Sequence, residues 1–140
     1  MTQTRLLYDA NVHANGIRQH YLRYGGKGRT LVLVPGITSP AITWGFVADR
    51  LAETHDVYVL DVRGRGLSSK GPDLEYDLDT YAADVRGFID ALSLKDVVLM
   101  GHSMGARIAI RTARQNDTGL AHLALIDPPV SGPGRRAYPA

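Results

Sequence analysis

A serine between two glycines has the residue types and spacing for nucleophilic chemistry. Residues 97–110, VVLMGHSMGARIAI, are largely apolar and are interrupted by GHSMG at residues 101–105. Between a strand and a helix, Gly-x-Ser-x-Gly forces a tight turn in which a Cβ on either glycine would collide with neighbouring backbone. The turn projects the hydroxyl outward, and the helix behind it directs free N–H groups toward negative charge. The pattern predicts that Ser103 is a nucleophile; the alternative is a turn that binds phosphate or no ligand.

A serine hydroxyl needs a base, and the base needs an orienting carboxylate. Asp127 directly follows the apolar residues 121–126, AHLALI. If these form a strand, the carboxylate lies at the C-terminal edge of the sheet, where α/β active sites collect. We predict Asp127 as the acid; the alternative is that it caps the turn begun by Asp-Pro-Pro. No histidine of this sequence is expected to be the base, because each is interpreted as a surface or packing residue, with His102 pointing away from Ser103: His13, His20, His55, His102 and His122.

Short apolar stretches rich in β-branched residues predict the strands that position these groups. Residues 30–34, 56–60, 96–100 and 121–126 have the continuous hydrophobicity of strands covered on both faces. Residues 8–24 alternate weakly and end at Gly25-Gly26, which predicts antiparallel strands at a sheet edge. The last apolar stretch resembles an interior strand, although little sequence follows that could cover it.

Three helices are expected between these strands. Ser39 and Pro40 form a suitable N-cap and first-turn pair for a helix through Trp44, Phe46, Val47 and Leu51. Residues 77–94 carry apolar side chains at spacings of three and four, and residues 104–116 supply the third helix. Alternation of strands and helices predicts right-handed βαβ units, and therefore an α/β fold with a mostly parallel sheet and helices on both faces.

Composition excludes several other classes of protein. The 140 residues are 44% hydrophobic and 21% charged, as in ordinary globular proteins. The net charge is +2, but the sixteen lysines and arginines are scattered, so nucleic-acid binding is not expected. Absence of cysteine excludes a disulfide scaffold and suits a reducing cytoplasm. No signal peptide or membrane-spanning stretch is expected, so we predict a cytoplasmic protein without membrane association.

Three motifs in order, LVPGITSP, DVRGRGLSS and GHSMG, resemble the α/β-hydrolase superfamily. The resemblance implies an oxyanion hole formed by the backbone N–H groups of Ile37 and Met104, and a pocket to which Thr38 and Trp44 contribute, although Trp44 could equally be a core residue. It implies no metal or organic cofactor. The DVRGRGLSS loop is interpreted as structural, turning through its glycines, rather than as a site for its two arginines.

The resemblance also implies what the rest of the site requires. The superfamily's histidine comes from near the C-terminus of a chain about twice this length, beyond a helical cap. Residues 1–140 are therefore expected to be the N-terminal part of one hydrolase core domain that is inactive alone. One alternative is that the missing half is a separate chain. The tail LIDPPVSGPGRRAYP resembles an amidohydrolase group that takes its acid from the earlier strand, which favours Asp127. Arg135 and Arg136 are candidates for a substrate carboxylate, or else solvated surface residues.

The expected substrate is a small amide or ester. Within the same fold, a carboxylesterase, a C–C hydrolase or a lactonase would use the same catalytic groups. A non-catalytic binding module on a degenerate hydrolase scaffold is a further alternative, favoured by the absent base and disfavoured by the retained elbow, oxyanion loop and acid.

Overall fold

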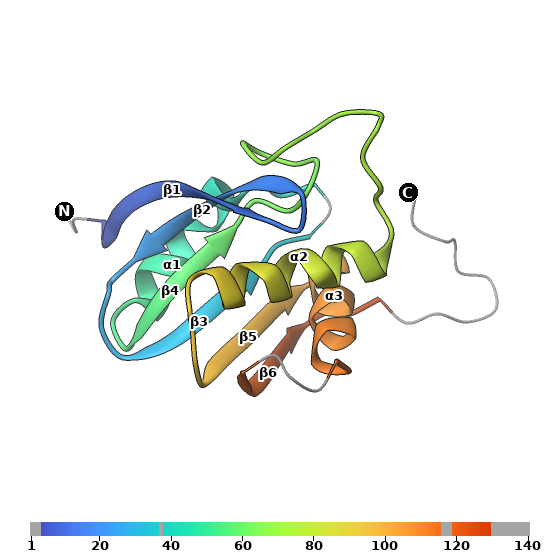
Figure 1. The fold of residues 1–140 in the computed structure, drawn as a ribbon. Helices are drawn as coiled ribbons and strands as arrows, with labels where there is room; N and C mark the ends of the chain where they lie inside the picture. The colour runs from blue at the N-terminus through green and yellow to red at the C-terminus, as the bar shows by residue number, and fades with distance from the viewer. Residues whose placement is uncertain (1–3, 37, 116–118, 130–140) are drawn as a thin grey trace.

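The computed structural model describes residues 4–36, 38–115 and 119–129, and these form one sheet in the order β1-β2-β4-β3-β5-β6 (Figure 1). The first two neighbouring pairs are antiparallel and the other three are parallel. The expected α/β architecture with a mostly parallel sheet is confirmed. The strands are β1 (Leu6–Ala14), β2 (Ile17–Tyr24), β3 (Arg29–Val34), β4 (His55–Leu60), β5 (Val97–His102) and β6 (Leu120–Ile126).

A tight hairpin joins β1 to β2. Asn15 and Gly16 have φ angles of 50° and 77°, the left-handed conformation at both central positions that a two-residue hairpin turn requires. The expected antiparallel strands are confirmed, but only β1 lies at the edge of the sheet. β2 is hydrogen-bonded on both sides, and most of its residues are buried.

The continuous hydrophobicity of the central strands follows from cover on both faces. Alternate residues of β3 face opposite sides: Val32 and Val34 pack in a core with residues of α2 (Leu78–Ala91) and α3 (Met104–Ala113). Leu31 and Leu33 pack in a second core with residues of α1 (Gly45–Leu51). Each buried side chain of this size contributes about 1.5–3 kcal/mol relative to exposure.

The second and third helices agree with their predicted positions. α2 begins after Asp77, whose carboxylate accepts a hydrogen bond from the Thr80 N–H, as an N-cap residue does. It ends at Ala91, three residues before the predicted end. α3 begins at Met104 and ends at Ala113, whereas the predicted end at residue 116 lies outside the described residues.

The predicted start of the first helix is wrong in its details. Ser39 is not the N-cap: a 3-10 helix, η1 (Ala41–Trp44), begins after Pro40 without a side-chain cap and is followed by α1. The local prediction failed because a distant carboxylate, that of Asp61, accepts the hydrogen bond from the Ala41 N–H. Phe46, which the pattern included in this helix, is 91% exposed.

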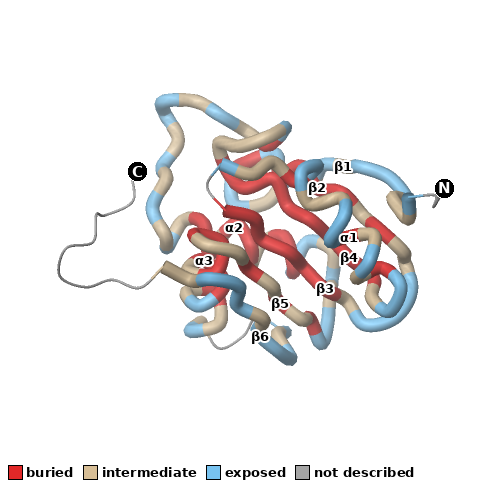
Figure 2. Tube along the Cα trace, turned by 180° about the vertical axis from the view of Figure 1, so that it is seen from behind, coloured by how far each residue is buried: buried red, intermediate tan, exposed pale blue. Residues whose placement is uncertain are grey.

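The strand at the other edge of the sheet is much less covered than the central ones (Figure 2). In β6 the side chains of Leu123, Leu125 and Ile126 are 39–41% exposed. The strand pairs with β5 on one side and has no partner on its other side among the described residues. None of the helices in the described ranges combines the length and apolar character needed to cross a membrane.

Candidate active site at the end of β5

Ser103 occupies a strained turn between β5 and α3. Its φ and ψ angles are 56° and −120°, a conformation that L residues rarely adopt and that costs about 1–3 kcal/mol. The Ser103 N–H donates to the Ile126 carbonyl at 3.0 Å, and its side chain makes no capping hydrogen bond. The hydroxyl is therefore not used in holding the helix and remains available for chemistry.

The flanking glycines are required by close contact between backbones. A Cβ on Gly101 would overlap the carbonyl of Gly105, and a Cβ on Gly105 would overlap the carbonyl of Val34. These neighbours are main-chain atoms in a strand and a helix, so neither can move aside cheaply. The strand-turn-helix geometry that the sequence predicted for GHSMG is present, and the catalytic role of its serine stays a prediction.

The segment after β3 lies directly against this turn. An ideal Cβ built on Gly36 would lie 3.5 Å from the Ser103 Cβ. Met104 is buried as the first residue of α3, so its backbone N–H has no acceptor one turn back within the helix. Ile37, the other predicted oxyanion donor, lies outside the described residues.

Asp127 lies beside Ser103 at the same edge of the sheet. His102 at the end of β5 pairs with Ile126 at the end of β6. Ser103 is the next residue after β5, and Asp127 is the next residue after β6. Asp127 has a φ of 49°, is exposed, and its carboxylate has no hydrogen-bond partner among the described residues. Residues 128 and 129 are prolines without N–H groups, so the alternative capping role would require donors outside the described ranges.

The other predicted pocket residues are placed differently. Thr38 is exposed, whereas Trp44 is half-buried and packs against the core on the α1 side. The Trp44 ring contacts the His102 ring edge-on, with centroids 5.2 Å apart. The His102 Nδ1 atom is buried and has no partner within the described part of the chain. Arg135 and Arg136 lie outside the described residues.

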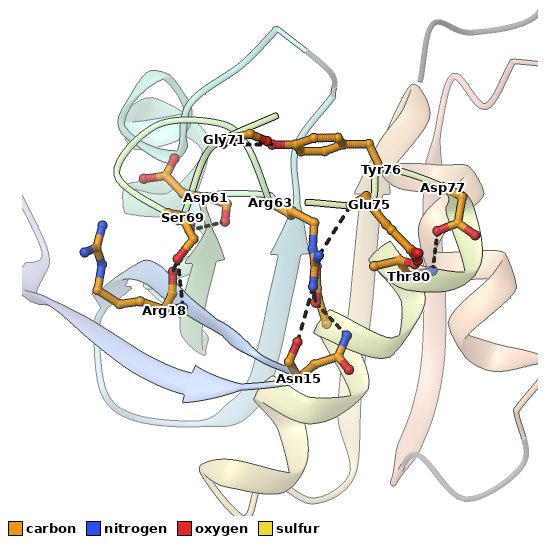
Figure 3. Close-up of polar contacts among 12 residues, drawn as sticks. Asn15, Arg18, Asp61, Arg63, Ser69, Gly71, Glu75, Tyr76, Asp77 and Thr80 are labelled. Atoms are coloured by element: carbon orange, nitrogen blue, oxygen red, sulfur yellow. Dashed lines mark hydrogen bonds and ion pairs between the residues drawn. The ribbon is translucent and has the colours of Figure 1, made fainter. Parts of the chain in front are cut away.

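The arginine at the start of the DVRGRGLSS loop has a structural role, as interpreted from the sequence. The Arg63 guanidinium forms two hydrogen bonds with the Asp84 carboxylate, at 2.8 and 2.9 Å, and both side chains are buried. It also donates to the carbonyls of Asn15 and Glu75 (Figure 3). The hydrogen bond to Asp84 raises the pKa of Arg63 above its ordinary value. The Arg63 guanidinium therefore joins the loop after β4 to α2 and to the hairpin turn.

His20 is a polar centre that the sequence interpretation missed. It is buried, and its ring nitrogens lie 2.7 Å from a carboxylate oxygen of Asp61 and 2.9 Å from one of Asp9. The hydrogen bond from His20 lowers the pKa of Asp9. The sequence feature that could have revealed this contact is the hairpin turn at Asn15-Gly16. The register set by the turn pairs Asn11 with His20, so Asp9 becomes a diagonal neighbour of His20 on the same face of the sheet.

Comparison with known proteins shows the family. The sequence profile of the alpha/beta hydrolase fold matches residues 29–139. The chain is 71% identical over 130 residues to N-formylmaleamate deformylase of Pseudomonas putida, covering 93% of this chain and 48% of that protein.

Solved structures give the same result. A crystallised N-formylmaleamic acid deformylase from Pseudomonas putida superposes with a TM-score of 0.86 at 58% identity, covering 95% of this chain and 52% of that one. A bacterial membrane phospholipase A superposes with a TM-score of 0.85 at 33% identity, covering 94% and 43%. The chain spans about half the length of curated relatives that it matches. With its strained serine between β5 and α3, this chain belongs to the alpha/beta hydrolase fold family.

Proposed function

We propose that this chain is the serine- and aspartate-bearing part of a hydrolase that cleaves the formyl C–N bond of N-formylmaleamate, giving maleamate and formate. The observation that carries the reaction class is that Ser103 is held at positive φ directly after β5, and that Asp127 directly follows the neighbouring strand β6. The substrate is proposed from the 71% identity to a deformylase of that name.

In this proposal the Ser103 Oγ attacks the formyl carbon while a histidine accepts its proton. The N–H groups of Ile37 and Met104 stabilise the oxyanion, and loss of one such donor costs about 3–4 kcal/mol of transition-state stabilisation. The C–N bond then breaks, the histidine returns the proton to the departing nitrogen, and maleamate leaves. Water hydrolyses the formyl ester to formate and restores Ser103; activation of water by Ser103 is the variant of this route. Neither a metal nor an organic cofactor takes part.

The histidine is proposed to come from a companion segment, either continuous with this chain or a separate polypeptide. Relatives about twice as long and the exposed apolar side chains of β6 support such a segment. Its contribution would let Asp127 orient the imidazole, as the acid of a triad does. We place the activity in the cytoplasm, which suits a chain without cysteine.

The decisive measurement is formate release from N-formylmaleamate by the protein together with its companion segment. We expect Ser103-dependent release, abolished in Ser103→Ala. Intact mass of the purified material should reveal the companion segment, and its absence from active material would contradict its proposed role.

Other hydrolases of this fold are the second candidate, favoured by the 33% identity to a phospholipase A. Ser103-dependent turnover of a p-nitrophenyl ester without formate release would select them. Absence of Ser103-dependent turnover of both compounds would select a non-catalytic binding module.

A further inference from the structure

Asp61, directly after β4, receives hydrogen bonds from three separate parts of the chain. Its Oδ1 accepts from the Ala41 N–H at 2.7 Å, and its Oδ2 accepts from the Leu67 N–H at 3.0 Å. The His20 Nδ1 lies 2.7 Å from the same Oδ2. The Asp61 side chain is 3% exposed, so these contacts are made away from solvent.

One of these contacts fixes the far end of the segment that follows β3, residues 36–41, here called the oxyanion segment. At its near end Gly36 lies against the Ser103 Cβ. At its far end Ala41 is fully buried and donates its N–H to Asp61. The candidate oxyanion donor, residue 37, lies in the sequence between these two fixed points.

We propose that Asp61, held by His20, is a positioning residue that sets the oxyanion segment relative to Ser103. The inference rests on the oxyanion hole of the proposed function. Asp61 touches neither substrate nor reacting atoms in this proposal; it acts through the backbone of Ala41. A preorganised donor loses much of its value when it is displaced by a fraction of an ångström, so the anchor matters for rate.

The chemistry of the network requires a carboxylate at this position. Two acceptor oxygens serve three donors, whereas an asparagine would direct an NH₂ group at one or more of them. The ring of His20 faces carboxylates at both nitrogens, Asp61 from the end of β4 and Asp9 from β1. A hydrogen bond to a carboxylate is stronger than one between two neutral groups. Gly66 completes the site, because a Cβ there would overlap the Asp61 carboxylate.

The test is Asp61→Asn in the protein with its companion segment, measured on N-formylmaleamate and on p-nitrophenyl acetate. We expect kcat to fall about 10- to 100-fold with KM nearly unchanged, because an oxyanion contact is made mainly in the transition state. The matched control is Asp56→Asn. Asp56 is a buried carboxylate at the opposite end of β4, paired with Arg23 at 2.9–3.0 Å, and its variant should keep the wild-type kcat.

A pair of substitutions at His20 covers the case in which Asp61→Asn does not fold. His20→Asn keeps a donor for Asp61, whereas His20→Leu leaves that carboxylate without its partner. We expect His20→Asn to retain more of the wild-type kcat than His20→Leu does.

The outcomes separate this inference from the proposed substrate. Ester turnover without formate release rejects the deformylase assignment. The ratio of the kcat of Asp61→Asn to the kcat of the wild type, both measured on the ester, still decides the role of Asp61. The positioning role would be overturned if Asp61→Asn had the same kcat as Asp56→Asn, or if its KM rose in parallel with the fall in kcat. Equal kcat values for the two His20 variants would also overturn it. If the wild-type protein with its companion segment turned over neither compound in a Ser103-dependent way, both proposals would be overturned.

Discussion

Asp61 and Asp127 both follow parallel strands at the same edge of the sheet, yet their surroundings are opposite. Asp61 ends an interior strand and is 3% exposed, with three donors around its oxygens. Asp127 ends the edge strand β6, is exposed, and has no partner among the described residues. A carboxylate in the interior must be satisfied by its own fold, because burying it unpaired is costly. A carboxylate at the edge stays available to a group brought from elsewhere, which is what an acid awaiting a histidine needs.

The largest expected effect concerns the edge carboxylate. Asp127→Asn should lower kcat about 10,000-fold in the protein with its companion segment, because an amide does not hold the imidazole in the required tautomer. The free energy of unfolding should change by no more than about 0.5 kcal/mol, because Asp127 is exposed and its carboxylate has no hydrogen-bond partner among the described residues. Steady-state kinetics and urea denaturation measure the two quantities. A loss of stability with retained activity would favour the capping role instead.

For the interior carboxylate, Asp61, we expect a large loss of stability where Asp127 shows almost none. Asp61→Ala should lower the free energy of unfolding by about 3–5 kcal/mol, because it leaves the buried His20 and two backbone donors without their acceptor. Urea denaturation of Asp61→Ala beside Asp127→Ala provides the comparison. Equal stability of the two variants would show that the hydrogen bonds around Asp61 contribute little, and the contrast between the two sites would fail.

The same contrast explains how much of the site could be predicted from sequence. The turn at Ser103 was predictable because its signature is local: the two required glycines lie within two residues of the serine, even though the space at Gly105 is limited by Val34 of the distant strand β3. The position of Asp127 followed equally from the preceding strand. The anchor at Asp61 was not predictable in this way, because its contact with His20 joins residues 41 apart in the sequence.

Long-range contacts also explain the one helix start that was predicted wrongly. Ser39 satisfies the local rule for an N-cap, but Asp61 accepts the hydrogen bond of the Ala41 N–H instead. Local propensity describes what a segment would do in the absence of its neighbours, and a buried carboxylate can replace the local cap. At Asp77 the local rule describes the structure, because its side chain accepts a hydrogen bond from the Thr80 N–H of the helix that follows.

Asp77 is therefore the intermediate case, an exposed carboxylate with a local partner. It accepts a hydrogen bond from the Thr80 N–H at 3.3 Å (Figure 3). Hydrogen bonding with Thr80, chiefly through the Thr80 side chain, lowers the pKa of Asp77 below its ordinary value of 3.8. Asp77→Ala should lower the free energy of unfolding by about 1 kcal/mol at pH 7, the usual value of an N-cap.

The pH dependence of this effect has a defined sign. Because the pKa of Asp77 is lower in the folded state, its charged form stabilises the protein above the ordinary pKa, and this contribution is lost as the pH falls through the folded pKa. The difference between wild type and Asp77→Ala should therefore shrink on acidification, measured by thermal unfolding at a series of pH values. Asp77→Asn is the matched control, because asparagine caps helices but does not titrate. The contrary outcome is that the stability difference between Asp77→Asn and Asp77→Ala shrinks on acidification as much as the difference between wild type and Asp77→Ala. The lost stability would then come from other carboxylates, and the charge of Asp77 would add nothing to its cap.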